Sequence, residues 1–116
     1  MIKVSLDEAY VFDLLSIYQV KSIKSDLDKK GKILVGFSNL SQEMITQIGY
    51  DKYTSIIDSE EYLELVKLND EIFDLVDRAN ESLIAKETAD KNIERYHTKI
   101  RLQNKFFESE IIETKI

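Results

Sequence analysis

The chain has 116 residues, enough for one domain, and contains neither cysteine nor proline. Without cysteine, disulfides, thiolate chemistry and cysteine-ligated zinc are excluded. The net charge of −6 argues against a nucleic-acid partner, because attraction to phosphates supplies most of that affinity. No apolar run approaches the ~18 residues of a membrane span, and no signal-peptide pattern is visible. We therefore expect a cytoplasmic protein without a membrane partner and without a cofactor.

The first predicted helix runs from Leu6 to Leu27. Ser5 and Glu8 have the spacing of a capping box, in which a serine N-cap is answered by a glutamate three residues later. The segment 28–32 is predicted to end this helix, since it brings lysines to the helix C-terminus and contains Gly31 as a breaker.

Shorter elements are predicted next. The apolar run 33–37 has no partner strand, so it is interpreted as a buried connector. Asn39 is the expected N-cap of a helix at 40–48, which Gly49 would terminate. The segment 50–57 is ambiguous, and one or two helical turns are expected there.

Asp58 and Ser59 are predicted to open the main helix, with Glu61 as the capping-box partner of Asp58. After them almost nothing interrupts the chain as far as Phe107. The favoured turn is at 86–90, where Thr88 or Asp90 could cap a new helix, and a continuous helix is the alternative. These elements predict a single all-α domain over residues 1–116. Its architecture would be a helical bundle built on a long antiparallel helical hairpin, with the N-terminal helix packed along it.

Helical periodicity predicts which faces are buried. The main helix places on one side Leu65, Leu68, Ile72, Val76, Ala79 and Leu83. The last helix does the same with Ala89, Ile93, Tyr96, Ile100 and Phe107. The first helix is apolar nearly all round, so it must be central or covered by a second copy of the chain. The isoleucines at 111, 112 and 116 are expected to pack on the first helix or on a partner chain. A homodimer is therefore expected, and a different protein partner is also conceivable.

Two polar residues interrupt the apolar stripes, namely Asp13 in the first helix and Asn69 in the main helix. Burial of an unpaired carboxylate costs several kcal/mol, so Asp13 needs a cation, an amide or water. Lys99 or Arg95 of the last helix, or Lys21 or Lys24 of its own helix, could supply the cation. Three interpretations stay open: a buried network that fixes helix register, a ligand or catalytic site, and an Asp13 that reaches solvent or a dimer partner.

Three blocks of the sequence carry a resemblance to a known family. They are "DLLSIYQVK" at 13–21, "LVKLNDEIFD" at 65–74 and "NIERYHTK" at 92–99. In order and type they resemble an uncharacterised family of small all-helical bacterial and phage proteins, a domain of unknown function. The richness in lysine and isoleucine is also typical of AT-rich phage genomes, which would place the protein in the host cytoplasm. The resemblance implies one set of polar residues, formed by Asp13, Lys21, Asn69, Asp74, Asn92, Arg95 and Lys99.

A second group of carboxylates resembles the paired acidic motifs with which all-α nucleotide pyrophosphohydrolases hold Mg²⁺. It consists of Glu60, Glu64, Glu71 and Asp74. These residues share one helix and lie opposite its apolar stripe, which favours ion pairs on a solvated face over a metal site. The sequence therefore predicts a non-enzymatic, self-associating interaction protein. The alternative is a small helical enzyme acting on a phosphorylated or anionic metabolite.

Overall fold

The computed structural model describes residues 1–2, 4–77 and 82–109. Its elements are α1 (Glu8–Lys24), α2 (Leu27–Ile48), α3 (Tyr50–Ile57), α4 (Glu60–Asp77) and α5 (Ser82–Phe107), and the described residues contain no strand. The predicted all-α class is therefore confirmed. No helix of the described chain is both long enough and apolar enough to cross a membrane.

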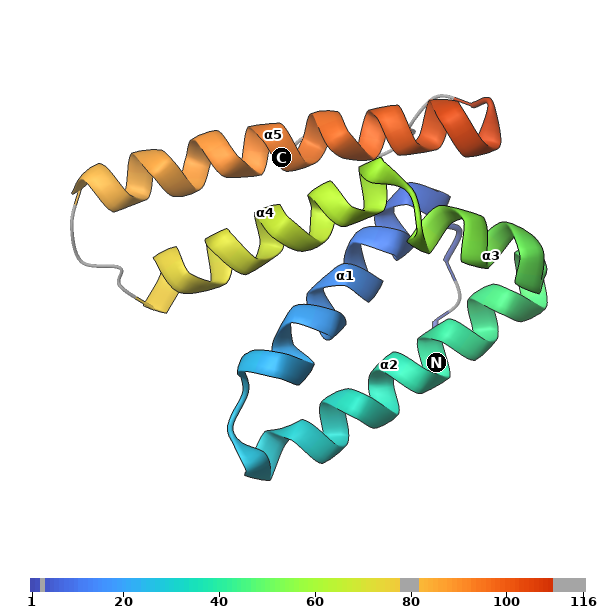
Figure 1. Ribbon diagram of the computed structural model, residues 1–116, viewed down its shortest axis with the longest axis horizontal. Coiled ribbons are helices and arrows are strands. Elements are labelled where there is room, and N and C mark those ends of the chain that lie inside the picture. Colours follow the sequence, from blue (N-terminus) through green and yellow to red (C-terminus); the bar gives the residue numbers. More distant parts are fainter. Residues whose placement is uncertain (3, 78–81, 110–116) are drawn as a thin grey trace.

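The helix α1 occupies the centre of the bundle, because it packs against α2, α4 and α5. Figure 1 shows α4 and α5 side by side and running in opposite directions, with α2 and α3 on the other side of α1. The central position predicted from the apolar circumference of α1 is confirmed. The main buried cluster gathers residues of all five helices: Ala9, Phe12, Leu15, Met44, Tyr53, Ile56, Tyr62, Leu65 and Leu102.

The capping box predicted at Ser5 is wrong, since Asp7 is the N-cap residue and α1 begins at Glu8. The Asp7 side chain makes no capping hydrogen bond either. Instead, the Ala9 backbone N–H donates to Oε1 of Gln103, 2.8 Å away in α5. A first-turn donor of a helix needs a partner, and here a distant helix provides it.

The end of the first helix was also predicted in the wrong place. Ser25 and Asp26 adopt extended backbone conformations and separate α1 from α2, whereas the segment 28–32 is helical. Gly31 lies inside α2, where a glycine costs only about 1 kcal/mol relative to alanine. The second glycine of α2, Gly36, lies against the ring of Tyr18, and a Cβ there would lie 2.8 Å from Cε1 of that ring. The glycine therefore lets α2 approach α1 closely.

The segment 33–37 is part of α2 and not a buried connector, and Asn39 lies in the middle of this helix and does not cap it. The predicted stop at Gly49 is confirmed. Its φ of 91° and ψ of 151° belong to a region that is essentially restricted to glycine. The backbone N–H of Gly49 donates to the carbonyl of Ile45, and its carbonyl accepts from the N–H of Tyr53. Gly49 thus ends α2 and begins α3.

The main helix begins close to where it was predicted, and Ser59 caps it, because its hydroxyl oxygen accepts the N–H of Tyr62 at 3.2 Å. Asp58, the predicted partner of Glu61 in a capping box, is instead the C-cap residue of α3. The turn predicted at 86–90 is wrong, since this segment lies within α5. Thr88 does not cap a helix, because its hydroxyl donates to the carbonyl of Ile84 one turn earlier, as interior threonines do. Between α4 and α5 lie residues 78–81, which are outside the described part of the chain, as are the side chain of Leu83 and the isoleucines at 111, 112 and 116.

Gly49→Ala should lower the free energy of unfolding by about 1–3 kcal/mol, because alanine is strained at this backbone conformation. Gly31→Ala is the matched control: a Cβ meets nothing within 4 Å at either position, but Gly31 is helical. It should therefore raise the free energy of unfolding, by up to about 1 kcal/mol. Urea unfolding measures both changes. Equal effects of the two substitutions would contradict the assigned backbone conformations.

Candidate functional site

The Asp13 carboxylate is buried between three helices, with only 4% of the residue exposed. Asn69 of α4 donates from Nδ2 to Oδ1 of Asp13 at 2.9 Å and to the hydroxyl of Ser16 at 2.7 Å. The Ser16 hydroxyl in turn donates to the backbone carbonyl of Asp13 at 2.6 Å. These bonds join α1 to α4, and they occupy both N–H groups of the Asn69 amide.

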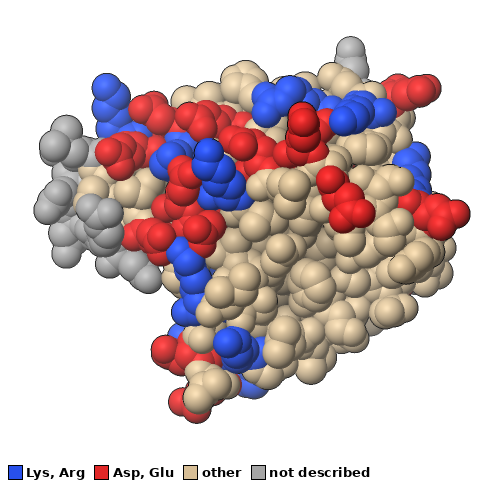
Figure 2. Space-filling model, in the orientation of Figure 1, with Lys and Arg blue, Asp and Glu red and all other residues tan. Residues whose placement is uncertain are grey.

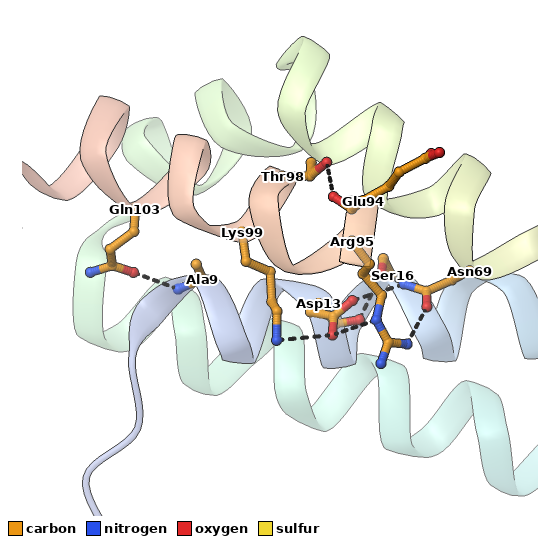
Figure 3. Close-up of polar contacts among 9 residues, drawn as sticks. All are labelled: Ala9, Asp13, Ser16, Asn69, Glu94, Arg95, Thr98, Lys99 and Gln103. Atoms are coloured by element: carbon orange, nitrogen blue, oxygen red, sulfur yellow. Dashed lines mark hydrogen bonds and ion pairs between the residues drawn. The ribbon is translucent and has the colours of Figure 1, made fainter. Parts of the chain in front are cut away.

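Two cations of α5 reach the other oxygen of the same carboxylate (Figure 3). Nε of Arg95 lies 3.7 Å from Oδ2 of Asp13, and Nζ of Lys99 lies 4.0 Å from it. Nη1 of Arg95 also donates to Oδ1 of Asn69 at 2.8 Å. Lys99 is only 7% exposed, and its ammonium lies 5.5 Å from the centre of the Tyr10 ring. We call Asp13, Ser16, Asn69, Arg95 and Lys99 the polar cluster.

A second buried polar contact continues the same row along α5. Gln103 follows Lys99 by four residues and is 1% exposed. Its Oε1 accepts the Ala9 N–H, and its Nε2 donates to Glu8 at 3.2 Å and to Ser109 at 2.9 Å. The inward face of α5 is thus largely polar. The predicted apolar stripe of the last helix is therefore wrong in part. Ala89 and Ile93 are exposed, whereas Phe107 packs against the core. The buried positions also include the polar residues Thr98, Lys99 and Gln103.

Three residues that the family resemblance joined to this set are not part of the polar cluster. Lys21 is exposed on α1 and lines a groove beside Asn69 and Arg95. Asn92 is exposed on α5. Asp74 pairs with Lys24, whose Nζ lies 2.5 Å from Oδ1 of Asp74 and 2.6 Å from Oδ1 of Asp70. Hydrogen bonds to these two carboxylates raise the pKa of the Lys24 ammonium. Lys24 therefore pairs with two carboxylates of α4 and is not the cation that neutralises the Asp13 carboxylate.

Sequence reasoning missed Ser16 and Gln103. A signal for Ser16 was present, because a residue three positions after Asp13 lies on the same side of a helix. For Gln103 there was none, since its main partner is a backbone N–H more than ninety positions away.

The four carboxylates of the pyrophosphohydrolase hypothesis are not arranged as a group. Glu71 pairs with Lys91 of α5, whose pKa is raised by that hydrogen bond, and Asp74 pairs with Lys24. Glu60 is exposed at the start of α4. Within the described residues, no three acidic, histidine or cysteine side chains lie close enough together to hold a metal ion.

Both carboxylate oxygens of Asp13 in the polar cluster already have partners. Oδ1 of Asp13 accepts from Asn69, Oδ2 faces Arg95 and Lys99, and the residue is almost inaccessible to solvent. A carboxylate that acts as a general base must lie within hydrogen-bonding reach of a substrate proton, and neither oxygen of Asp13 is open to one. The arrangement suits a network that fixes the relative positions of α1, α4 and α5.

Comparison of the chain with protein-family models, with curated proteins and with solved structures finds no match. The resemblance to an uncharacterised family therefore stays a prediction.

Proposed function

We propose that the chain is a non-enzymatic protein that acts by binding a protein surface, and that the partner is a second copy of itself. The supporting observation is the outward face of α2. Its apolar residues Leu27, Leu34 and Val35 are 86%, 50% and 60% exposed, respectively. Apolar side chains gathered on one face of a protein often mark an interaction site.

The helix α2 is weakly covered for its length of 22 residues, since only Ser41 and Met44 are buried. It packs on α1 and α3. Figure 2 shows charged side chains along α4 and α5 and at the lower left, where α2 begins, and a broad area over α1 and the rest of α2 that has none. A stable interface needs about 800 Å² on each partner, so a face that extends beyond a single helix is required.

The spacing of the outward residues favours another helix as the contacting element. Leu27, Gly31, Leu34 and Ser38 follow one another at intervals of four, three and four, the seam spacing of paired helices. All four are uncharged and exposed, and Gly31 and Ser38 are small enough to allow close approach.

A second copy fits this face on grounds of charge and symmetry. Each copy has a net charge of −6, so two copies repel unless they meet through uncharged surface. A two-fold dimer joins the same face of both copies, and such dimers are the commonest oligomers. The uncharged α2 face of one copy against that of the other satisfies both conditions.

An enzymatic role of the pyrophosphohydrolase type has less support. Two of the four carboxylates that it needs, Glu71 and Asp74, are held by lysines.

Leu34→Glu should convert the dimer into a monomer, because it brings like charges together at the two-fold contact, at a cost of several kcal/mol. Leu63→Glu is the matched control, since Leu63 of α4 is similarly exposed, at 56%, but lies outside the α2 face. Sedimentation velocity at tens of micromolar should give a dimer for the unmodified chain and for Leu63→Glu, and a monomer for Leu34→Glu. A monomeric unmodified chain at that concentration, or equal behaviour of the two variants, would refute the proposal.

A further inference from the structure

A groove with a volume of about 290 Å³ opens beside the polar cluster, between α1, α4 and the Arg95 side chain of α5. Its apolar lining consists of Ile17, Val20, Ile72, Phe73 and Val76. Its polar lining consists of Lys21, Asn69 and Arg95. The volume is at the low end of the range for small-molecule sites, so any ligand would be small.

The charge of this groove is opposite to that of the protein as a whole. Among the described residues, two cationic side chains and no carboxylate line it, although the chain carries a net charge of −6. The buried carboxylate of Asp13 faces Arg95 and Lys99 together and does not line the groove. An anion is therefore the favoured polar group of a ligand here.

The guanidinium of Arg95 has N–H groups that donate no hydrogen bond within the described residues. Nη1 is bonded to Asn69 and Nε faces Asp13, whereas Nη2 donates to no residue in the described part of the chain (Figure 3). About a quarter of the side chain is exposed, 26%. The bonds to Asn69 and Asp13 hold the guanidinium in place, so its remaining N–H groups would meet an anion with little loss of side-chain freedom.

We propose that this groove binds a small amphipathic carboxylate. The carboxylate of the ligand would lie between Arg95 and Lys21, since guanidinium and ammonium groups form the strongest hydrogen bonds with carboxylates. The hydrocarbon part would lie against Phe73, Ile72 and Val76. A purely apolar ligand would leave the two cations partly desolvated without a partner, and a purely ionic one would make no use of the apolar lining.

The test uses hexanoate as the probe, with hexan-1-ol and hexylammonium as controls of equal chain length. Each is titrated into the ¹⁵N-labelled chain, and backbone and arginine Nε–Hε resonances are followed by NMR. Hexanoate should shift the resonances of Lys21, Phe73 and Arg95 saturably, with a Kd of about 1 mM for so small a ligand. Hexanol should bind at least about threefold more weakly, and hexylammonium should not saturate.

Lys21→Gln should weaken hexanoate binding about two- to fivefold, the effect of one partly exposed ion pair. Lys29→Gln is the matched control, because Lys29 is exposed and does not line this groove, and the Kd of this variant should equal that of the unmodified chain. Lys29 lines the adjoining groove, which shares Lys21 and Phe73 with this one, so an unchanged Kd in Lys29→Gln also assigns binding to the groove at Arg95. Arg95→Gln should weaken binding more strongly than Lys21→Gln. Arg95 also contacts Asp13, so Arg95→Gln could fail to fold. In that case the Kd of Lys21→Gln for hexanoate and the Kd of the unmodified chain for hexanol test the proposal. Equal affinities for hexanoate and hexanol, an unchanged Kd in Lys21→Gln, or shifts without saturation would overturn the proposal.

Discussion

Asp13→Leu should lower the free energy of unfolding by about 3–5 kcal/mol, because it removes the carboxylate that Arg95 and Lys99 share and so breaks a buried ion pair from one side. Lys99 is only 7% exposed, and Arg95 lies between Asp13 and Asn69. The leucine would also leave an N–H of Asn69 without its acceptor. Urea unfolding followed by circular dichroism measures the change.

Asp13→Asn separates the contribution of the charge from that of the hydrogen bond. The amide oxygen can still accept from Asn69, but Arg95 and Lys99 lose the negative charge, so we expect a smaller loss of about 1–3 kcal/mol. Asp90→Leu serves as the control, since Asp90 is exposed on α5 and should change the free energy of unfolding by no more than about 0.5 kcal/mol. A loss from Asp13→Leu as small as that of the control would show that the polar cluster does not hold the helices together.

Phe12→Ala should cost about 3–5 kcal/mol of unfolding free energy, through lost burial and the cavity that remains. The ring is 1% exposed and lies 6.2 Å from that of Tyr53, 6.3 Å from that of Tyr62 and 6.4 Å from that of Phe107, measured between ring centres. It thereby joins α1 to α3, α4 and α5.

Phe12→Leu keeps most of the volume and should cost clearly less than Phe12→Ala. The denaturant midpoints of the two variants are compared. If the free energy of unfolding depends on denaturant concentration with the same slope in both, the difference between the midpoints measures stability alone. If both variants unfold at the midpoint of the unmodified chain, the helices are not held together around this ring.

Local backbone signals predicted only some of the helix boundaries. The stop at Gly49 and the start of the main helix near Ser59 were placed correctly, because a positive φ and a hydroxyl cap depend on a few adjacent residues. The capping signals at Ser5 and Asn39 were misleading. The break between α1 and α2 was missed because it falls at Ser25 and Asp26, and neither residue is a glycine or a proline. The glycine that was expected to end the helix, Gly31, is tolerated within α2.

The buried face of α5 could not be predicted from periodicity of apolar residues. Its buried positions include Thr98, Lys99 and Gln103, which are satisfied by groups on other helices. Such burial depends on contacts across the chain, which a local pattern does not contain.

The candidate site was predicted in part. Asp13 and Asn69 stood out because each interrupts an apolar stripe, and the structure joins them at 2.9 Å. Arg95 and Lys99 belong to the same cluster. Asp74 was included through the family resemblance, but its helix turns it toward Lys24.

The most direct test of self-association through α2 is an isotope-filtered NOE experiment on a mixture of ¹³C-labelled and unlabelled chains. The proposal predicts cross-copy NOEs from the methyl groups of Leu27, Leu34 and Val35, three exposed side chains of the α2 face. Cross-copy NOEs confined to other exposed residues such as Leu63 and Val76, or none at concentrations of several hundred micromolar, would contradict it.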